Sequence, residues 1–361
     1  MTDASHIAAR LAWVGAIREP GTVLSWSLPE WERVVRLGRR LRLLARLAER
    51  VEAAGLLEQV PPQPRRHLVA EQRLSRYRTA AVAWALEQVG QSLQGLAAPC
   101  VLLKGAAYLG QDLPLAAGRL PSDVDILVPK DRLPAAQLLL REAGWTEAQL
   151  SEHDRRYYYE WSHEVPPMVH AVHPIELDLH HDILPPTART TVDIDRLLAR
   201  LGPSKWPGWQ VLEPADQVLH AAAHLFFDSE LRDRLRDLVD LDGLFRHFGA
   251  RDGFWERLVE RAHELGLTEP LALAVGFCCD WLGTPVPAAT QAELLRIGPS
   301  GVRRRWLTAL FGAVLSPLEP DDEPSFRRTA ASWVILARYH HWRMPLRLLV
   351  PHLLAKGAGG V

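Results

Sequence analysis

The chain has 361 residues, of which 48% are hydrophobic, so it can bury a sizeable core and is neither a disordered nor a fibrous protein. Its 42 basic and 43 acidic side chains leave a formal net charge of -1, which excludes capture of nucleic acid or an anionic membrane by bulk attraction. The cysteines, Cys100, Cys278 and Cys279, form neither a disulfide framework nor a zinc-ligand spacing. We therefore expect a cytoplasmic protein that binds any anionic substrate in a local site.

The first part of the chain has the period of amphipathic helices. Apolar residues recur every three or four positions across residues 29–54, which predicts one long helix. Pro61, Pro62 and Pro64 are expected to break this pattern, and a second helix is predicted over residues 68–93. Residues 1–98 are therefore predicted to form a helical N-terminal segment.

From Cys100 the pattern changes to short apolar runs bounded by glycine, proline and serine, which is typical of strands. The predicted strands are residues 100–103, 124–128, 157–162, 168–172 and 175–180. Helices are predicted at residues 105–109 and 134–143, the second ending at Gly144. This order predicts an α/β (α+β) core with a mixed sheet over residues 99–213, covered by helices on at least one face.

Beyond Pro214 the helical period returns. The predicted helices are residues 215–227, 231–248, 254–265, 271–282, 302–315 and 326–341. We expect residues 214–354 to form a helical C-terminal domain and the glycine-rich residues 355–361 to be a flexible tail. The most apolar of these helices, residues 271–282, is too short to cross a membrane and contains Asp280, so no membrane span is predicted.

Two aspartates begin the second predicted strand. Asp123 and Asp125 are two residues apart in the stretch Ser122-Asp123-Val124-Asp125-Ile126-Leu127-Val128, so a strand would direct both carboxylates to one face. Adjacent carboxylates suit Mg²⁺ or Mn²⁺, which accept oxygen ligands together with phosphate oxygens. The alternative is structural: Asp123 would cap a turn and Asp125 would pair with an arginine.

A lysine and a glycine connect the first predicted strand to the helix that follows. Gly105 would let the backbone approach a phosphate closely, and Lys104 would add a mobile positive charge. Lysine is rare in this chain, with four among the 42 basic residues, and no Walker A motif is present. The alternative is a surface turn with a solvated lysine.

A second set of ionisable groups lies on the last predicted strand. Glu176, Asp178 and His180 alternate with apolar residues and share one face, and such a row is costly to bury unless it binds something. Asp178 is the candidate third metal ligand or general base, Glu176 is its competitor, and His180 is a hydrogen-bonding or proton-relay group. An exposed sheet face is the alternative. Arg119 would either clamp a phosphate or neutralise Asp123.

Taken together, these segments resemble the polymerase-β-type nucleotidyltransferase superfamily, and more closely the bacterial family of uncharacterised nucleotidyltransferases. The shared motifs are Val101-Leu102-Leu103-Lys104-Gly105-Ala106, Arg119 with the stretch from Ser122 to Val128, Ala143-Gly144-Trp145, and Glu176-Leu177-Asp178-Leu179-His180. The likeness continues into the helical part, in Ala215-Asp216-Gln217-Val218-Leu219-His220, His224 and Leu235-Arg236-Asp237-Leu238-Val239-Asp240-Leu241. It covers residues 31–248.

The resemblance implies a Mg²⁺-dependent transfer of a nucleoside monophosphate from an NTP to an acceptor, with release of pyrophosphate. It implies that Asp123, Asp125 and Asp178 hold the metal and activate the acceptor. The nucleotide would be bound by Lys104, Gly105, Arg119, Ser122 and His180. The superfamily usually has Gly-Ser at the phosphate turn, whereas this chain has Lys104-Gly105.

Other functions of the same fold are retained as alternatives. One is a non-catalytic protein that senses a nucleotide or docks a partner, and another is a kinase or phosphodiesterase that uses the same metal site. The acceptor is not specified, and the near-neutral charge favours a small molecule or a protein over RNA.

Several further polar residues are predicted to be structural. His220 and His224 could share a metal on one helix, but the helix lacks the glutamate of zinc proteases, so a packed or substrate-facing pair is favoured. Asp237, Asp240 and Asp242 lie in an Arg/Asp-rich helix and are predicted on a solvated, salt-bridged face.

Overall fold

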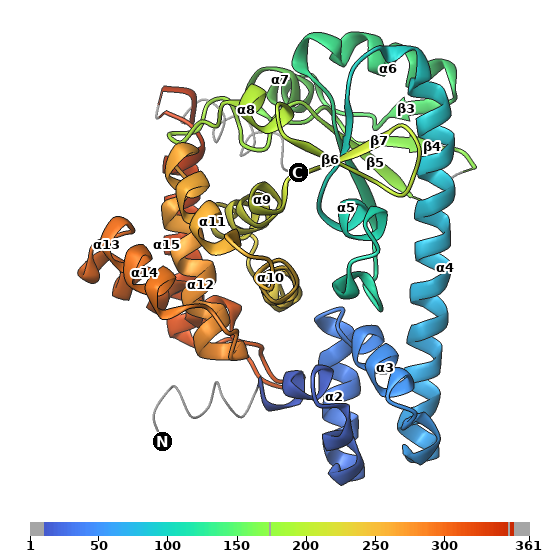
Figure 1. Cartoon of the computed structure of the whole chain (residues 1–361), viewed down its shortest axis with the longest axis vertical. Coiled ribbons are helices and arrows are strands. Elements are labelled where there is room, and N and C mark those ends of the chain that lie inside the picture. Colours follow the sequence, from blue (N-terminus) through green and yellow to red (C-terminus); the bar gives the residue numbers. More distant parts are fainter. Residues whose placement is uncertain (1–10, 173–174, 346, 350–361) are drawn as a thin grey trace.

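The computed structural model of the protein describes residues 11–172, 175–345 and 347–349 (Figure 1). The tail predicted at residues 355–361 lies outside the described residues. The chain starts with short 3-10 helices, η1 (Ala12–Ile17) and η2 (Pro20–Ser25), followed by α2 (Leu28–Arg40), α3 (Leu44–Ala53), η3 (Leu57–Gln59), α4 (Pro62–Ser92) and η4 (Leu93–Leu96). The long helix α4 runs from the N-terminal helices to the sheet, where it contacts β2.

The single long helix predicted first is wrong, because the chain bends between α2 and α3. Arg42 adopts a left-handed conformation, with φ of 55°. The Arg42 N–H donates to the carbonyl of Arg39 at 3.0 Å, and the Leu43 N–H donates to that of Gly38 at 2.8 Å. These two bonds form a Schellman motif, which ends a helix and usually places glycine where Arg42 stands. The bend lets Leu41 and Leu43 both point into the core, where they are buried.

The next helix begins earlier than predicted. The prolines were expected to precede it, but α4 starts at Pro62 and includes Pro64 in its first turn. Proline is tolerated there because the first N–H groups of a helix have no partner within it.

A mixed sheet follows, as predicted from the sequence, and it has seven strands. Its strands are β1 (Cys100–Leu102), β2 (Asp123–Leu127), β3 (Trp145–Glu147), β4 (Met168–His170), β5 (Glu176–His180), β6 (Leu201–Pro203) and β7 (Trp209–Leu212), in the order β3-β4-β5-β2-β1-β7-β6. The pairs β2–β5 and β1–β7 are parallel, and the other pairs are antiparallel. The strands missed by the sequence analysis have three or four residues each, which is too short for an alternating pattern to be visible.

The strand predicted at residues 157–162 is wrong, because this segment belongs to the helix α7 (Glu152–Trp161). Three consecutive tyrosines suggested a strand, since aromatic residues favour strands. The residues at the start of α7 favour a helix instead. The Ser151 hydroxyl accepts a hydrogen bond from the Asp154 N–H at 3.1 Å, and Glu152 and Asp154 place negative charge in the first turn.

Helices cover the sheet and form the rest of the chain. Within the sheet region these are α5 (Lys104–Gly110), η5 (Pro114–Ala116), η6 (Lys130–Arg132), α6 (Leu133–Glu142) and α8 (Ile194–Leu198). After β7 come α9 (Pro214–Phe226), α10 (Leu235–Phe248), α11 (Phe254–Glu264), α12 (Thr268–Leu282), α13 (Ala288–Ile297), α14 (Gly301–Leu315) and α15 (Phe326–Arg343). The six C-terminal helices predicted from the sequence are confirmed, and α13 was not predicted.

One apolar cluster runs through the molecule. It joins buried residues of the N-terminal helices, the sheet and the C-terminal helices, among them Trp31, Ile126, Phe226 and Phe311. In Figure 1 the C-terminal helices lie at the left of the molecule and α4 lies at the right. Within the described residues, no helix combines the length and apolar character that a membrane span requires.

Candidate active site

The parallel pair β2–β5 places the predicted carboxylates side by side. Asp123 is the register partner of Glu176, and Asp125 is the partner of Asp178. Partners in a parallel sheet point to the same face, so the two strands present one row of acidic groups. The intervening residues, Val124, Ile126, Leu177 and Leu179, point to the opposite face and are buried in the core. That apolar face fixes the register and therefore the row.

Asp125 is the most buried of these carboxylates and is held by two hydrogen-bond donors. Its Oδ1 atom accepts hydrogen bonds from Lys104 Nζ at 2.8 Å and from His180 Nε2 at 3.0 Å. Burial by itself raises the pKa of Asp125, but the Lys104 charge and the His180 hydrogen bond outweigh it and hold this pKa well below its ordinary value. Asp125 is thus ionised, and Lys104 supplies the positive charge beside it.

The pKa of Asp178 is shifted in the opposite direction to that of Asp125. Burial, and then the negative charge on Asp125, raise the pKa of Asp178 to about 8. Two carboxylates therefore share a site in which one of them holds its proton at neutral pH. Such a pair accommodates a divalent cation, which would release that proton.

Glu176, the competitor for the third carboxylate, is exposed. It does not line the cavity that Asp123, Asp125 and Asp178 line. The geometry therefore favours Asp178.

These carboxylates open into a cavity of about 250 Å³. Its lining comes from β2, β5, α5, α9, α10 and the segments next to them, and most of it is charged. The lining residues are Lys104, Tyr108, Arg119, Asp123, Asp125, Glu164, Asp178, Ala221, His224, Arg234, Arg236, Asp237 and Asp240. The site thus has oxygen ligands for a cation and positive groups for phosphates in one place.

Arg119 does not neutralise Asp123, which was one of the two roles considered for it. Its Nε donates to Asp240 Oδ2 at 3.0 Å, while Arg46 Nη2 donates to Asp240 Oδ1 at 2.6 Å. Gly105 lies beneath the guanidinium, and a Cβ atom there would stand 2.0 Å from Arg119 Nη1. The glycine in the Lys-Gly turn therefore leaves room for the Arg119 guanidinium where it pairs with Asp240.

Asp240 corrects a second expectation from the sequence. It was predicted on a solvated helix face, but it is buried between Arg46 and Arg119, with only 5% of its side chain exposed. Asp242 is buried as well, and accepts hydrogen bonds from Arg246 Nε at 2.7 Å and Thr284 Oγ1 at 2.6 Å. The Arg/Asp-rich pattern of α10 thus forms internal ion pairs rather than a wet surface.

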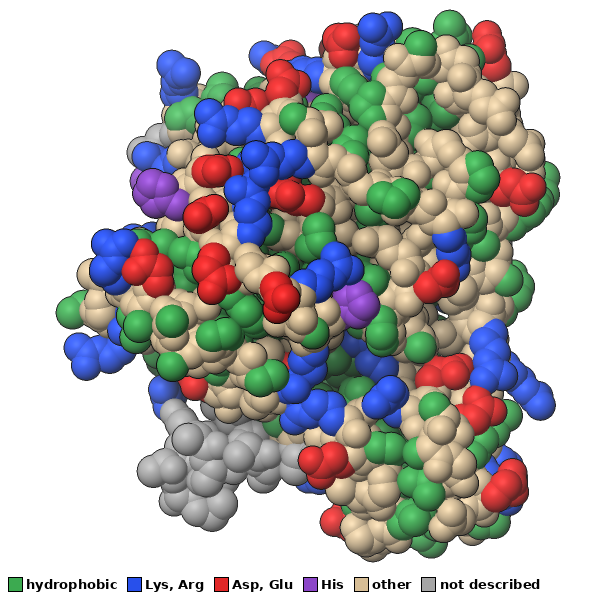
Figure 2. Space-filling model, in the orientation of Figure 1, with side chains coloured by type: hydrophobic (Ala, Val, Ile, Leu, Met, Phe, Trp, Pro, Cys, Tyr) green, Lys and Arg blue, Asp and Glu red, His purple; other side chains and the backbone are tan. Residues whose placement is uncertain are grey.

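Arginines also gather at the entrance to β2. Arg42 Nη1 donates to Ser122 Oγ at 3.4 Å, and Arg78 Nη1 donates to the Pro121 carbonyl at 3.3 Å. Burial and then the positive charge of Arg236 lower the pKa of Arg42. In Figure 2 blue Lys and Arg side chains surround a hollow between α10 and the N-terminal helices. Cations that repel one another in this way favour the binding of an anion.

Ser122 and His180 each contact a predicted carboxylate. The Ser122 hydroxyl is 3.1 Å from Asp123 Oδ1, and His180 Nε2 binds Asp125. The predicted residues therefore converge on one region, although their elements are separated in the sequence.

The sequence analysis missed His163 and Glu164, which follow α7. Glu164 lines the cavity, and its Oε2 is 3.5 Å from His180 Nε2. Because the residues just before them, 157–162, were predicted as a strand and not as the end of a helix, the position of His163 and Glu164 next to β5 could not be anticipated. An isolated bridge pairs Glu164 with His180 and brings the two side chains together.

His220 and His224 lie one turn apart in α9. His220 is buried, and His224 is half-buried and lines the cavity. Burial lowers the pKa of His220 to about 3 and that of His224 well below its ordinary value. The pair belongs to no group of three metal-ligating side chains among the described residues.

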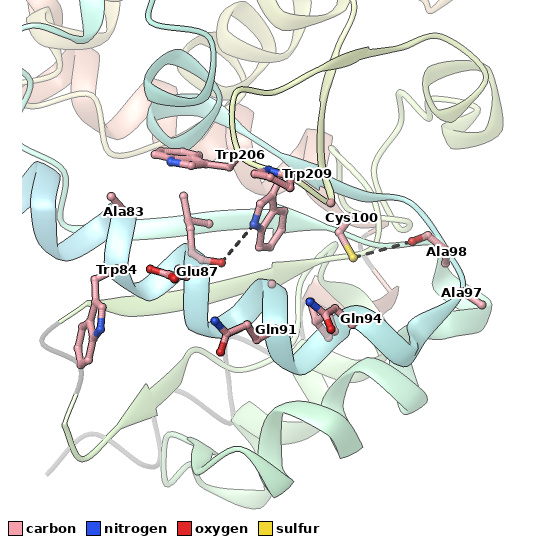
Figure 3. Close-up of a pocket in the computed structure, with 15 residues that line it drawn as sticks. Ala83, Trp84, Glu87, Gln91, Gln94, Ala97, Ala98, Cys100, Trp206 and Trp209 are labelled. Carbon is pink, nitrogen blue, oxygen red and sulfur yellow. Dashed lines mark hydrogen bonds between the residues drawn. The ribbon is translucent and has the colours of Figure 1, made fainter.

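A larger cavity, of about 800 Å³, lies between α4 and the loop that connects β6 to β7 (Figure 3). The Trp209 indole points from β7 toward α4, and its Nε1 donates to the Leu86 carbonyl at 3.2 Å. Trp206, Trp84 and Glu87 also line this cavity, but none of the carboxylates of β2 and β5 does. The smaller cavity is therefore the candidate active site, because it contains the groups that can do chemistry.

The fold and this cavity define an α/β protein that presents a row of carboxylates from adjacent parallel strands to a cation-lined pocket. The chain belongs to the family of uncharacterised nucleotidyltransferases, whose family model matches residues 27–283. The match includes every residue of the 250 Å³ cavity. It supports nucleotidyl transfer as the general kind of reaction. No curated protein and no solved structure matches the chain.

Proposed function

We propose that the protein is a Mg²⁺- or Mn²⁺-dependent nucleotidyltransferase that transfers a nucleoside monophosphate from an NTP to an acceptor and releases pyrophosphate. The observation that carries this proposal is the position of Asp123, Asp125 and Asp178 on one face of β2 and β5, open to a cavity that also contains Lys104 and Arg236. Carboxylates and cations that converge from different elements are what phosphoryl transfer requires, because most of its catalysis is alignment and charge neutralisation.

The donor set fits a divalent cation. Asp123 and Asp178 offer carboxylate oxygens in addition to that of Asp125, and no Lys or Arg of the described residues forms an ion pair with Asp178. Oxygen ligands of this kind suit Mg²⁺, which supplies Lewis-acid stabilisation of the phosphate charge when bound. We assign Asp123, Asp125 and Asp178 to the cation.

The residues of this chain have distinct tasks in the transfer. The acceptor oxygen attacks the α-phosphorus, the bond to the β-phosphate breaks, and pyrophosphate leaves. We assign the acceptor proton to Asp178, because a bound cation would release this carboxylate's own proton and leave it able to accept another. Lys104, which pairs with Asp125 here, would exchange that partner for a phosphate oxygen.

The arginines of the entrance complete the nucleotide site in this proposal. Arg42, Arg78 and Arg236 lie next to Ser122 and Asp123 and would bind the leaving phosphates. Arg119 and Gly105 act by packing against each other, so Arg119 holds the position of the Lys104 turn. For the acceptor we propose a small molecule or a protein side chain rather than RNA, because the chain has no excess of basic residues.

The test is thermal stabilisation by ATP, GTP, CTP and UTP, each with and without Mg²⁺, since a ligand that binds only the native state raises the melting temperature. A Mg²⁺-dependent rise is expected in the native protein and in Asp131→Asn, which changes an exposed aspartate of η6. It is expected to be absent in Asp123→Asn. No rise with any NTP, or an equal rise in Asp123→Asn, would contradict the proposal.

Labelled nucleotides distinguish the reactions that a metal site of this kind can support. Label from the α-phosphate of the NTP should appear on the acceptor while pyrophosphate is released. Transfer of the γ-label would indicate a kinase, and free nucleoside monophosphate without transfer would indicate a phosphodiesterase. Lys104→Met should weaken triphosphate binding more than monophosphate binding, and equal weakening of both would remove Lys104 from the phosphate site.

One observation favours a non-catalytic alternative. The Lys104 ammonium already neutralises Asp125, and a permanent pair of this kind would leave no place for a metal on that carboxylate. A protein that only senses nucleotides would then bind an NTP equally well with and without Mg²⁺ and would form no product.

A further inference from the structure

The geometry points to a second metal site, formed by His163, Glu164 and His180, that takes a divalent transition metal such as Zn²⁺ next to the proposed Mg²⁺ site. One ring nitrogen of each histidine and one carboxylate oxygen of Glu164 lie within 4.8 Å of one another. None of the functions considered so far assigns a metal to these three residues.

The distances suit direct coordination. His180 Nε2 and Glu164 Oε2 are 3.5 Å apart. Two ligands bound at about 2.1 Å to a tetrahedral ion are about 3.4 Å apart, so this pair needs almost no movement to share an ion. The rings of His163 and His180 have centroids 5.3 Å apart, and one nitrogen of each lies within 4.8 Å of the other and of a Glu164 oxygen.

The backbone holds these ligands in place. Residues 163–165 run beside the end of β5, where the Val165 N–H donates to the Leu179 carbonyl at 3.0 Å and the His181 N–H donates to the His163 carbonyl at 2.9 Å. Glu164 and His180 face each other across an isolated bridge. The three ligands are therefore positioned before any ion binds, which lowers the cost of binding.

The hydrogen bonds around the histidines are incomplete. His163 Nδ1 and His180 Nδ1 are both buried without a hydrogen-bond partner among the described residues. In addition, two carboxylates, those of Asp125 and Glu164, converge on the single Nε2 atom of His180. One N–H cannot satisfy both carboxylates. An ion bound to His180 Nε2 would take the place of that proton and be ligated by Glu164, while Asp125 would keep its hydrogen bond from Lys104.

The ligand types select the metal. Two imidazoles and one carboxylate suit Zn²⁺ and its neighbours in the first transition row, whereas Mg²⁺ prefers oxygen ligands. Three protein ligands also leave one position of a four-coordinate ion open. Glu164 lines both the 250 Å³ cavity and a neighbouring one of about 180 Å³, which His163 lines as well. The open position can therefore be reached by water or by an acceptor oxygen.

The experiment is titration of the chelator-treated, dialysed full-length protein with Zn²⁺ in competition with a chromophoric chelator, and with Co²⁺ followed by its visible absorption. We expect one saturable site for each metal and the strong absorption of a four-coordinate Co²⁺ ion. His163→Gln and Glu164→Gln should each weaken binding at least tenfold. Glu164 has 28% of its side chain exposed, so Glu164→Gln is expected to fold, which its melting temperature without metal checks.

Two matched variants separate this site from its neighbours. His220→Gln removes a buried histidine outside the cluster, and Asp123→Asn removes a ligand of the proposed Mg²⁺ site; both should keep Zn²⁺ affinity within twofold. Absence of saturable Zn²⁺ or Co²⁺ binding, or equal affinity in Glu164→Gln, would overturn the inference. Loss of Zn²⁺ binding in Asp123→Asn would also overturn it, because the ion would then occupy the aspartate site. None of these results depends on nucleotide binding.

Discussion

The buried ion cluster of Arg46, Asp240 and Arg119 offers a quantitative test of the structure. Replacing Asp240 by asparagine removes the charge but keeps the shape. Arg46 has 6% of its side chain exposed and Arg119 has 10%, so neither guanidinium can turn to water. Breaking a buried pair by removing one partner costs about 3–5 kcal/mol. Because Asn can still accept a hydrogen bond from one arginine, we expect Asp240→Asn to lower the free energy of unfolding by about 3 kcal/mol, the lower end of this range.

Thermal unfolding measures this loss. At roughly 2 °C per kcal/mol for a large chain, Asp240→Asn should melt about 6 °C below the native protein. The control is Asp321→Asn, which removes an exposed partner of Arg36 and should leave the melting temperature unchanged. A melting temperature for Asp240→Asn equal to that of the control would refute the reasoning, because both arginines would then be reaching water.

Two further predictions concern backbone and titration. Gly118 and Gly55 both have φ of 70°, but a Cβ atom on Gly118 would stand 2.4 Å from Arg46 Cα, whereas one on Gly55 meets nothing within 4 Å. In urea unfolding, Gly55→Ala should therefore lower the free energy of unfolding by about 1 kcal/mol, and Gly118→Ala should lower it several times as much. Equal losses in the two variants would contradict the close approach of Gly118 to Arg46. In the unfolded chain His220 takes up a proton as the pH falls below its usual pKa of 6.5, whereas in the folded chain it does so only near pH 3. The free energy of unfolding therefore decreases as the pH falls between these two values, by up to about 1.4 kcal/mol per pH unit. The melting temperature of His220→Gln should consequently rise relative to that of the native protein as the pH is lowered from 6.5 to 4. A difference in melting temperature that stays constant over this range would show that His220 is protonated in the folded state.

The sequence predicted the elements that carry strong periodicity. The mixed sheet, its strands β1, β2, β4 and β5, the helix α6 and the C-terminal helices are confirmed, because these elements bury apolar residues in a regular pattern. The predicted aspartates lie on one face because a strand of alternating residues can bury only the other face. The positions of those residues followed from local rules, whereas their chemical roles remain proposals.

The errors have a common cause in contacts between distant segments. Nothing near Arg42 in the sequence marks a helix end, since the bend is stabilised by burial of Leu41 and Leu43. The partners of Asp240 are 121 and 194 residues away, so an arginine-rich helix could not be distinguished from a solvated one. His163 and Glu164 reach the site only through their backbone bonds to the end of β5.

The Arg46–Asp240–Arg119 cluster also bears on how the chain can vary over evolution. Its members come from α3, from the turn before β2 and from α10, and all of them lie within the matched residues 27–283. A substitution at one of these positions leaves a buried charge without its partner at the others, so the three residues are expected to change together or not at all. We therefore expect α3, the turn before β2 and α10 to vary together, whereas α13, α14 and α15 contribute no residue to this cluster and lie beyond the matched residues.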